Sequence, residues 1–382
     1  MNIKILASTK EGNVITKDEA MIFSGKAAGI CYMPEDIDTL FSESETKTIK
    51  RAKMTLESGH HSVYDHVVYN LALVDIPKIL AMVLNNEKMY TTSEKSARYT
   101  KMKPSEKEEA LYLKWIDIFK KVIVDNYSFI EEKQIEKLAM ENARYLISVF
   151  TPATTMEYTV SIRQLNYIMH WFENFIANEY DNSFNILLKQ SMKEFNEQLK
   201  ELYIPELNTE VKGRKLSLFD ERVDRQEEFG ENYSINYYGT FTQFAQAQRH
   251  RTISYSMRLS NKVEYFVPPI IKDTDYENEW LEDISSLAEL FPQGMLVKIN
   301  ERGTAENFIL KCEERLCGCA QLEIQNQTKK TLDRYIEETR ITNKEVNEYL
   351  LKYSKGPRCT FEGYKCAKPC VWGPNNAFNR LI

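Results

Sequence analysis

The stretch "QAQRHRTISYSMRLS" (246–260) gives the clearest early indication of how this chain folds and what it binds. Arg249, His250 and Arg251 stand side by side in it. Adjacent cations repel one another, so we expect an anion to lie among them. The whole chain carries a formal net charge of −6. A local basic cluster in an acidic chain indicates a small anionic ligand rather than bulk binding to nucleic acid.

Length and composition predict a globular protein of about two domains. The chain has 382 residues, 43% of them hydrophobic, and its 22 Tyr and 18 Phe argue against disorder. The first residues lack the apolar run of a signal peptide. The most apolar stretch, 67–84, is interrupted by Asn70, Asp75, Pro77 and Lys78, so we expect no membrane span. Seven cysteines without a signal peptide predict a reducing cytoplasm.

Hydrophobic periodicity predicts an α+β protein whose second half repeats the order of the first. Strand-like runs are expected at 66–74 and 233–244, and a linker rich in turn-forming residues at 203–215. Apolar residues at helical spacing predict helices at 107–124, 132–150, 161–177, 182–202, 277–291, 304–323 and 325–340.

Two polar motifs of the first half each have a functional and a structural interpretation. "GHHSVYDH" (59–66) holds three of the five histidines and could bind a metal, or its polar groups could cap the following strand. "SEKSARY" (93–99) could close a hydroxyl, a guanidinium and a ring around a phosphate or a pyrimidine, or could be a solvated loop.

The second half adds an arginine and a cysteine-rich tail. Arg315, in "EERLCGCAQLEIQ" (313–325), could reach into a cleft or pair with Glu313 or Glu314 on its own helix. Several tail thiolates could hold a structural zinc, although their spacing fits no common zinc motif. The candidates are Cys312, Cys317, Cys319, Cys359, Cys366 and Cys370. No GxGxxG, Walker A or GxSxG motif is present, so any dinucleotide binds outside the Rossmann scheme.

Taken in order, these motifs resemble the flavin-dependent thymidylate synthases, which carry a GHxSxxEH-like element and an RHR segment followed by Ser-x-Arg-Tyr. "ENAR" (141–144) and "TVSIRQL" (159–165) resemble two further elements of that family, and "AQLEIQ" (320–325) resembles its late helix. The resemblance covers most of the chain as two fused copies, 1–208 and 209–382. It implies that each copy folds as a small, mainly antiparallel sheet with several long helices.

The two copies depart from the family pattern in complementary ways. The first has Phe172 in place of the late-helix arginine and "NEK" (86–88) in place of RHR. The second has Leu259 and Asn261 in place of the loop serine and arginine. The first keeps His60, Ser62, Ser96, Arg98, Arg144 and Arg163; the second keeps Gln246, Arg249, His250, Arg251 and Arg315. The resemblance therefore implies one working type of site made by both copies, and a homodimer that replaces the family's tetramer.

The resemblance also implies a reaction and a role for each retained residue. The reaction is methylation of dUMP to dTMP with FAD, using methylenetetrahydrofolate and NADPH. The implied catalytic residues are Ser96 and Arg249. Substrate contacts fall to Gln246, Arg249, Glu94, Ser96, Arg98, Arg144 and Arg315. FAD contacts fall to His60, Ser62, Arg163, Arg249, His250 and Arg251. Ser161 stands where the family has asparagine, and Met257 where it has a flavin-contacting glutamate.

Two alternatives remain open on the sequence. The chain could be a diverged enzyme of the same fold that modifies another pyrimidine nucleotide, such as a hydroxymethylase. It could also be a protein that binds a nucleotide without turnover.

Overall fold

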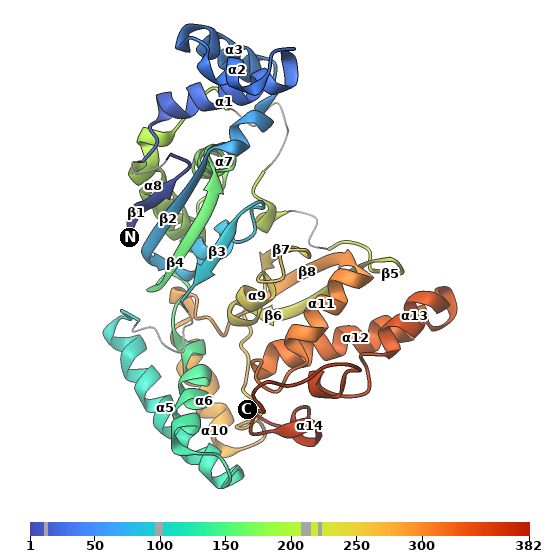
Figure 1. The fold of residues 1–382 in the computed structure, drawn as a ribbon. Helices are drawn as coiled ribbons and strands as arrows, with labels where there is room; N and C mark the ends of the chain where they lie inside the picture. Colours follow the sequence, from blue (N-terminus) through green and yellow to red (C-terminus); the bar gives the residue numbers. More distant parts are fainter. Residues whose placement is uncertain (11–13, 96–101, 208–214, 221–223) are drawn as a thin grey trace. The chain divides into compact units, whose positions relative to one another are not determined.

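The computed structural model describes residues 1–10, 14–95, 102–207, 215–220 and 224–382 (Figure 1). The chain forms two compact units, Met1–Lys103 with Phe150–Leu216 and Pro104–Val149 with Ser217–Ile382. Residues 104–149, from the first half of the sequence, thus belong to the same unit as the second half. The boundary at 208/209 divides the sequence into two copies and stays a prediction; the compact units follow a different division.

The first unit is built on a four-stranded antiparallel sheet in the order β1-β2-β4-β3. In the central strand β2, the side chains of Tyr69, Leu71 and Leu73 are fully buried and alternate with partly exposed neighbours. This two-residue alternation gives the sheet its core face. The strands are β1 (Asn2–Ser8), β2 (Val68–Pro77), β3 (Thr91–Glu94) and β4 (Pro152–Ser161).

Helices of the first unit pack around this sheet. β4 runs directly into α7, whose first turn is capped by Ser161, because the hydroxyl accepts a hydrogen bond from the backbone N–H of Gln164. In Figure 1, α7 and α8 lie along the sheet and α1 to α3 gather at one end of the unit. The helices are α1 (Lys17–Tyr32), α2 (Ile37–Ser42), α3 (Glu45–Glu57), α4 (Lys78–Leu84), α7 (Ile162–Asn178) and α8 (Ser183–Leu199), with a 3-10 turn η1 (His61–His66).

The second unit holds a four-stranded antiparallel sheet in the order β5-β6-β8-β7. Read from the first strand of each unit, this order is the same as that of the first sheet. Thr304 caps the helix after β8 as Ser161 caps the helix after β4. The shared order supports two related halves. The strands are β5 (Glu228–Phe229), β6 (Asn232–Thr240), β7 (Ser254–Leu259) and β8 (Leu296–Thr304).

Aromatic packing explains why residues 104–149 join the second unit. Trp280 of α10 lies edge-on to Trp115 and Phe119 of α5, with ring centroids 4.8 and 5.6 Å apart. All three side chains are fully buried. The helices are α5 (Glu106–Asn126), α6 (Glu132–Ala143), α9 (Phe241–Ala247), α10 (Asp275–Ser285), α11 (Ala305–Arg315), α12 (Leu322–Thr342), α13 (Lys344–Leu351) and α14 (Gly373–Asn376).

Three expected helices end at least six residues earlier than periodicity predicts: those at 132–150, 277–291, which ends at Ser285, and 304–323. α6 stops at Ala143, because the segment after it pairs with the backbone of residues 291–294: Gln293 N–H donates to the carbonyl of Ile147 and Gly294 N–H to that of Tyr145, both at 2.8 Å. The approach needs a glycine, since a Cβ at Gly294 would lie 2.9 Å from the Tyr145 Cβ. α11 stops at Arg315, and the carbonyl of Leu316 accepts from the tail.

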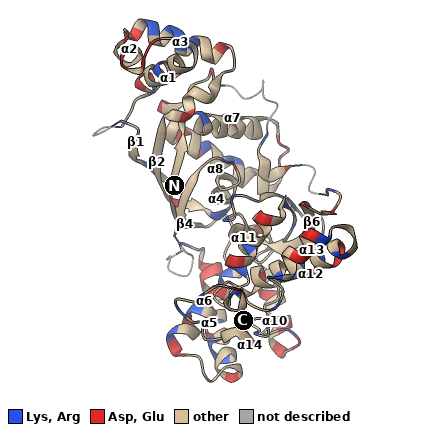
Figure 2. Cartoon of the chain, turned by 45° about the vertical axis from the view of Figure 1, so that its right-hand side comes forward, with Lys and Arg blue, Asp and Glu red and all other residues tan. Residues whose placement is uncertain are grey.

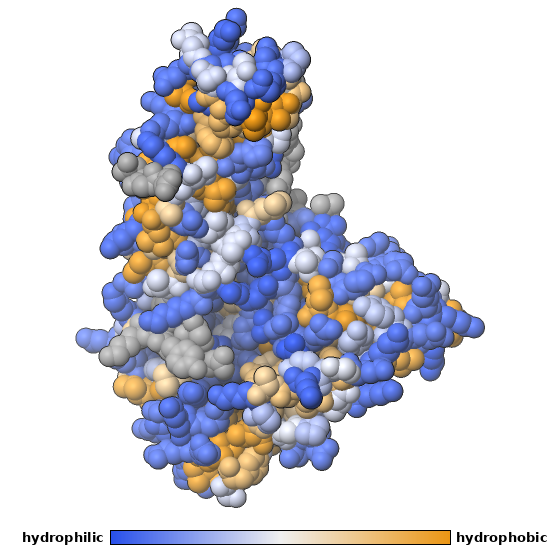
Figure 3. Space-filling view, viewed as in Figure 1, coloured by the Kyte–Doolittle hydropathy of each residue, from blue (hydrophilic) through white to orange (hydrophobic). Residues whose placement is uncertain are grey.

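Surface charge and hydropathy are mixed in both units. Both Lys or Arg and Asp or Glu occur on α2 and α3 and on α13, whereas α7 is mostly uncharged in this view (Figure 2). Hydrophilic residues cover much of the face in view, with apolar residues in separate patches (Figure 3). Among the helices of the described ranges, none is both long enough and apolar enough to cross a membrane.

The Trp280→Ala change should destabilise the second unit by about 3–5 kcal/mol, because it empties a buried aromatic site that several rings line. Urea unfolding followed by circular dichroism measures this. Tyr180→Ala is the control: its side chain is 69% exposed, so its free energy of unfolding should change by less than about 0.5 kcal/mol. Equal losses in the two variants would contradict the role given to the aromatic cluster.

Candidate functional site: a polar network around Arg144 and Arg315

Arg315 ends α11 and binds the segment that follows α9. Its Nε donates to His250 Nε2 at 2.8 Å and its Nη2 donates to the backbone carbonyl of Gln246 at 3.1 Å. Arginine has donors only, so the Nε2 of His250 must offer a lone pair. His250 is therefore neutral, with its proton on Nδ1.

The surroundings of His250 keep it neutral. Burial, followed by the charges of Arg315, Lys311 and Arg249, lowers the pKa of His250 to about 2. Lys311 is itself fully buried and pairs with the buried carboxylate of Glu301, with Nζ and Oε2 2.6 Å apart. The His250 ring, which lies next to Arg315, therefore stays neutral over the physiological pH range.

Arg144 comes from the first half of the sequence and lies in the same unit. It follows α6 directly, and its side chain is only 8% exposed. Its Nη2 donates to Gln321 Oε1 at 3.1 Å, and Gln246 Nε2 donates to the same oxygen. Among the described residues, the Arg144 Nε has no hydrogen-bond partner. A buried cationic donor without a partner indicates a place where an anion binds.

Glu323, on the first turn of α12, connects the segment that carries Arg144 with the segment that carries Gln246. Its carboxylate accepts from the Thr240 N–H at 2.9 Å, from the Thr240 hydroxyl at 2.7 Å and from the Tyr145 hydroxyl at 2.8 Å. Tyr145 is the neighbour of Arg144, and Thr240 caps α9, which carries Gln246. Burial raises the pKa of the Glu323 carboxyl, and the donors from Thr240 and Tyr145 oppose that rise.

Four predicted site residues are therefore joined by hydrogen bonds within one unit: Arg144, Gln246, His250 and Arg315. Arg249 and Arg251 flank His250 and are exposed. We call the four hydrogen-bonded residues, together with Gln321, Glu323 and Tyr145, the Arg144–Arg315 network.

The residues predicted to contact FAD from the first copy lie in the other unit. His60 and Ser62 are exposed, at and just before η1. Arg163 pairs with Asp65 at 2.6 Å, and the Ser161 hydroxyl donates to the same carboxylate at 2.7 Å. Asp65 thus fixes the direction of the Arg163 side chain.

Glu94 takes part in a structural ion pair. Its carboxylate lies 2.5 Å from Lys78 Nζ and accepts from the Thr154 hydroxyl at 2.8 Å. A nucleotide would therefore have to compete with Lys78 for it. Ser96 and Arg98, predicted to close over the substrate, lie outside the described residues.

Neither proposed metal site gains support. Within the described ranges, no three His, Cys, Asp or Glu side chains are placed to hold a metal ion. In "GHHSVYDH", His61 is buried, with Nδ1 2.9 Å from the Tyr167 hydroxyl and Nε2 3.1 Å from the Leu56 carbonyl. His61 therefore ties the turn to α7 and to the last turn of α3, whereas the structural interpretation expected the polar groups to cap the following strand.

Sequence reasoning did not name four residues that shape these sites: Asp65 as a partner of Arg163, Tyr145, Gln321 and Glu323. Gln321 and Glu323 lie within "AQLEIQ", the run that resembles the family's late helix. The resemblance of this segment to the family's late helix was the signal that could have identified Gln321 and Glu323.

Comparison with known proteins identifies relatives of the first half. Residues 14–200 match the family model "Thymidylate synthase complementing protein". A flavin-dependent thymidylate synthase of Clostridium tetani (strain Massachusetts / E88) is 27% identical over 184 residues, which cover 40% of this chain and 73% of that protein.

Solved structures give a weaker likeness. A crystal structure of the flavin-dependent thymidylate synthase ThyX from Helicobacter pylori, complexed with FAD and dUMP, has a TM-score of 0.31 at 13% identity and covers 54% of this chain and 95% of its own. The UMP/dUMP methylase PolB from Streptomyces cacaoi, bound with 5-Br dUMP, has a TM-score of 0.34 at 14% identity, with coverages of 54% and 92%. TM-scores of this size do not establish a shared fold.

His250 should show no titration between pH 5 and 8 when its ring is followed by ¹³C-histidine NMR, because its pKa is held near 2. Arg315→Gln should raise that pKa, since it removes a nearby positive charge and frees Nε2, while burial, Lys311 and Arg249 still keep it below 6.5. The signal is assigned with His250→Gln. A wild-type midpoint near 6.5 would contradict the arrangement.

Proposed function

We propose, from the premise that this chain belongs through residues 14–200 to the flavin-dependent thymidylate synthase family, that it methylates dUMP to dTMP. FAD is the proposed cofactor, methylenetetrahydrofolate the proposed methylene donor and NADPH the proposed reductant. FAD, when bound, supplies the hydride chemistry that no amino-acid side chain can provide. The chain's own residues bind, orient and polarise the nucleotide.

The observation that carries this proposal is the position of Arg144. A buried guanidinium with an unpartnered Nε lies in one hydrogen-bonded network with Gln246 and Arg315. Two guanidinium groups held by neighbouring backbone and side-chain acceptors are suited to bind a phosphate with bidentate hydrogen bonds. We assign the dUMP phosphate to Arg144 and Arg315.

Gln246 and Arg249 would then contact the uracil. Gln246 Nε2 donates to Gln321, which fixes the amide and leaves its oxygen to accept from the base. The exposed cation of Arg249 would stabilise negative charge on the uracil carbonyls as C5 becomes nucleophilic. Such stabilisation by a prearranged charge is a common source of rate enhancement.

His250 would act as a hydrogen-bond donor. Its Nε2 accepts from Arg315, so only the Nδ1 proton can face a ligand. Since the ring stays neutral, we propose that it binds flavin by donation from Nδ1 and takes no part in acid–base catalysis.

The first copy would supply the remaining contacts. We assign Ser96 and Arg98 to closure over the nucleotide and His60, Ser62 and Arg163 to FAD, with Asp65 orienting Arg163. The equal strand order of the two sheets supports the idea that two former subunits are fused in this chain. We further propose that two chains form a homodimer in the cytoplasm, in place of a tetramer of single copies.

The test is direct. Purified protein should bind FAD and absorb near 450 nm, should release tritium from dUMP labelled at C5, and should form dTMP in the presence of methylenetetrahydrofolate and NADPH. Mass analysis of the product separates methylation from hydroxymethylation. Protein that takes up no FAD, or that binds dUMP without turnover, would contradict the proposal.

Arg249→Ala and Ser96→Ala should each abolish turnover, because both residues are assigned to the same type of site. An Arg340→Ala variant, which removes an exposed arginine from the last turn of α12, is the control and should keep full activity. If the site forms between chains, a mixture of the two inactive variants should regain up to about a quarter of the activity. Residual activity near one half in each single variant would indicate two independent sites.

A further inference from the structure

The turn between α11 and α12 carries two cysteines separated by one glycine, in the sequence "CGC" (317–319). The N–H of Ala320 donates to the carbonyl of Cys317 at 2.9 Å, and the Gln325 side chain donates to the same carbonyl at 3.0 Å. The N–H of Cys319 donates to the Cys317 sulfur at 3.5 Å. A four-residue turn closed in this way brings the α-carbons of its first and third residues within the range that a disulfide spans.

We propose that Cys317 and Cys319 form a thiol–disulfide exchange site, which small-molecule disulfides such as glutathione disulfide oxidise reversibly. Cys317 is half-buried and Cys319 is exposed, so a small molecule can reach the pair. The hydrogen bond that the Cys317 sulfur accepts favours its thiolate. The thiolate is the form of cysteine that attacks a disulfide.

The C-terminal tail holds this turn from both sides. Arg358 N–H donates at 2.7 Å to the backbone carbonyl just before the turn, and Arg380 Nη2 donates to the carbonyl of Ala320 at its end. A Cβ at Gly318 would lie 2.7 Å from Cys370 Sγ, so this tail sulfur lies over the turn at a place that glycine leaves free. Because the two turn thiols are already held near each other, a disulfide between them costs little further conformational entropy.

The surroundings favour a thiol pair over a metal site. Within the described ranges, no three His, Cys, Asp or Glu side chains are placed to hold a metal ion, whereas a disulfide needs only two sulfurs. Two other cysteines provide contrasts. Cys312 is buried in α11. Cys31 is exposed, but it is the only cysteine in the sequence of the first unit and has no partner thiol there.

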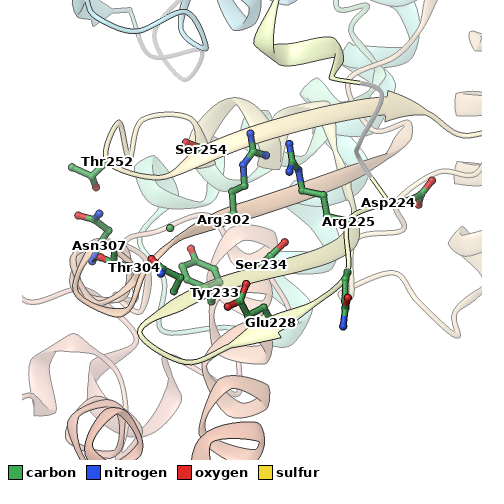
Figure 4. A pocket seen from close by; sticks show the side chains of 13 residues that line it. Asp224, Arg225, Glu228, Tyr233, Ser234, Thr252, Ser254, Arg302, Thr304 and Asn307 are labelled. Carbon is green, nitrogen blue, oxygen red and sulfur yellow. Dashed lines mark hydrogen bonds between the residues drawn. The ribbon is translucent and has the colours of Figure 1, made fainter. Parts of the chain in front are cut away.

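The turn is separate from the large cavity of the second unit. That cavity, about 1000 Å³ in volume, lies beside β6, β8 and the start of α11 (Figure 4). The CGC turn follows the opposite end of α11. Among the described residues that line the cavity, none is a cysteine.

The exchange occurs in two balanced steps. The Cys317 thiolate attacks one sulfur of the small-molecule disulfide, whose S–S bond breaks and releases one thiolate. The Cys319 thiol then loses its proton, attacks the mixed disulfide at the Cys317 sulfur and displaces the second thiolate. The two released thiolates take up the two protons that the protein thiols have lost. The cysteine pair loses two electrons, and the small-molecule disulfide gains them.

Oxidation of the turn would act on the Arg144–Arg315 network. Arg315 lies two residues before the CGC turn, and Gln321, which accepts a hydrogen bond from Arg144, lies two residues after it. A disulfide draws the ends of the turn together and so shifts Arg315 relative to Gln321. This step rests on the proposed function, because it takes dUMP as the anion that the network binds. The oxidised protein should bind dUMP about fivefold more weakly or worse.

Mass analysis of the full-length protein tests the exchange site. Reduced protein, freed of reductant, is treated with glutathione disulfide, alkylated with N-ethylmaleimide and digested with trypsin. Peptide 316–329 holds both turn cysteines. It should lose two hydrogen atoms and take up no alkyl group, at least about tenfold faster than Cys31 reacts, and dithiothreitol should restore both thiols. Cys31 should stop at a mixed disulfide with glutathione, because no second cysteine lies in its unit.

Two results of the mass analysis would overturn the inference. One is a peptide 316–329 that stays doubly alkylated, or that becomes linked to the tail peptide containing Cys370. The other is a stoichiometric amount of zinc in protein purified without a chelator, since thiolates that bind a metal are not free to exchange.

The dissociation constant for dUMP, measured before and after oxidation, tests the effect on the network. A variant that combines Cys317→Ser with Cys319→Ser should have the same affinity in both conditions. Cys366→Ser, which changes an exposed cysteine of the tail, should respond as the wild type does. Equal affinity of reduced and oxidised wild type would contradict the coupling. Failure of the reduced protein to bind dUMP would contradict the proposed function, and the mass analysis would still decide the exchange site.

Discussion

The second unit depends on one constraint: polar groups buried at the start of α12 must find partners, and those partners come from distant parts of the sequence. Gln321 accepts from Arg144 and from Gln246, and Glu323 accepts from Tyr145 and Thr240. An unpaired buried carboxylate or amide costs several kcal/mol, so these bonds form together or not at all. The same bonds that satisfy α12 therefore place a first-half arginine beside second-half cations.

Local patterns identified most of the fold. The helices at 107–124, 161–177 and 325–340 and the strand at 66–74 are present within a few residues, because each has clear periodicity or β-rich composition. The α+β class is observed as well. Periodicity overestimated the length of the helix expected at 132–150, because the backbone of residues 145–149 pairs with that of residues 291–294. The contact of Trp115 with Trp280 joins segments 165 residues apart, and no local pattern predicts it. That contact is why the compact units differ from the sequence copies.

In the candidate site, too, sequence motifs identified some residues and missed others. Arg144, Gln246, His250 and Arg315 were identified because they match motifs whose side chains bind ligands in the family. Asp65, Gln321 and Glu323 bind protein groups, so no ligand-based motif points to them. The protonation of His250 also needed the structure, since only the position of Arg315 and the burial of the ring show that it is neutral. Glu94 is the opposite case. Its motif predicted a substrate contact, but its carboxylate forms an ion pair with Lys78 within the protein.

The central claim is that Arg144 and Arg315 bind one anion together, and a double-mutant cycle on the dissociation constant for dUMP tests it most directly. The proteins are the wild type, Arg144→Gln, Arg315→Gln and the double variant. Hydrogen bonds between charged groups predict that each single change weakens binding about tenfold or more, or about 1.4 kcal/mol. Because the two arginines share a ligand and a network, the double variant should lose at least about 1 kcal/mol less than the sum. Strictly additive losses, or a single change without effect, would contradict the account.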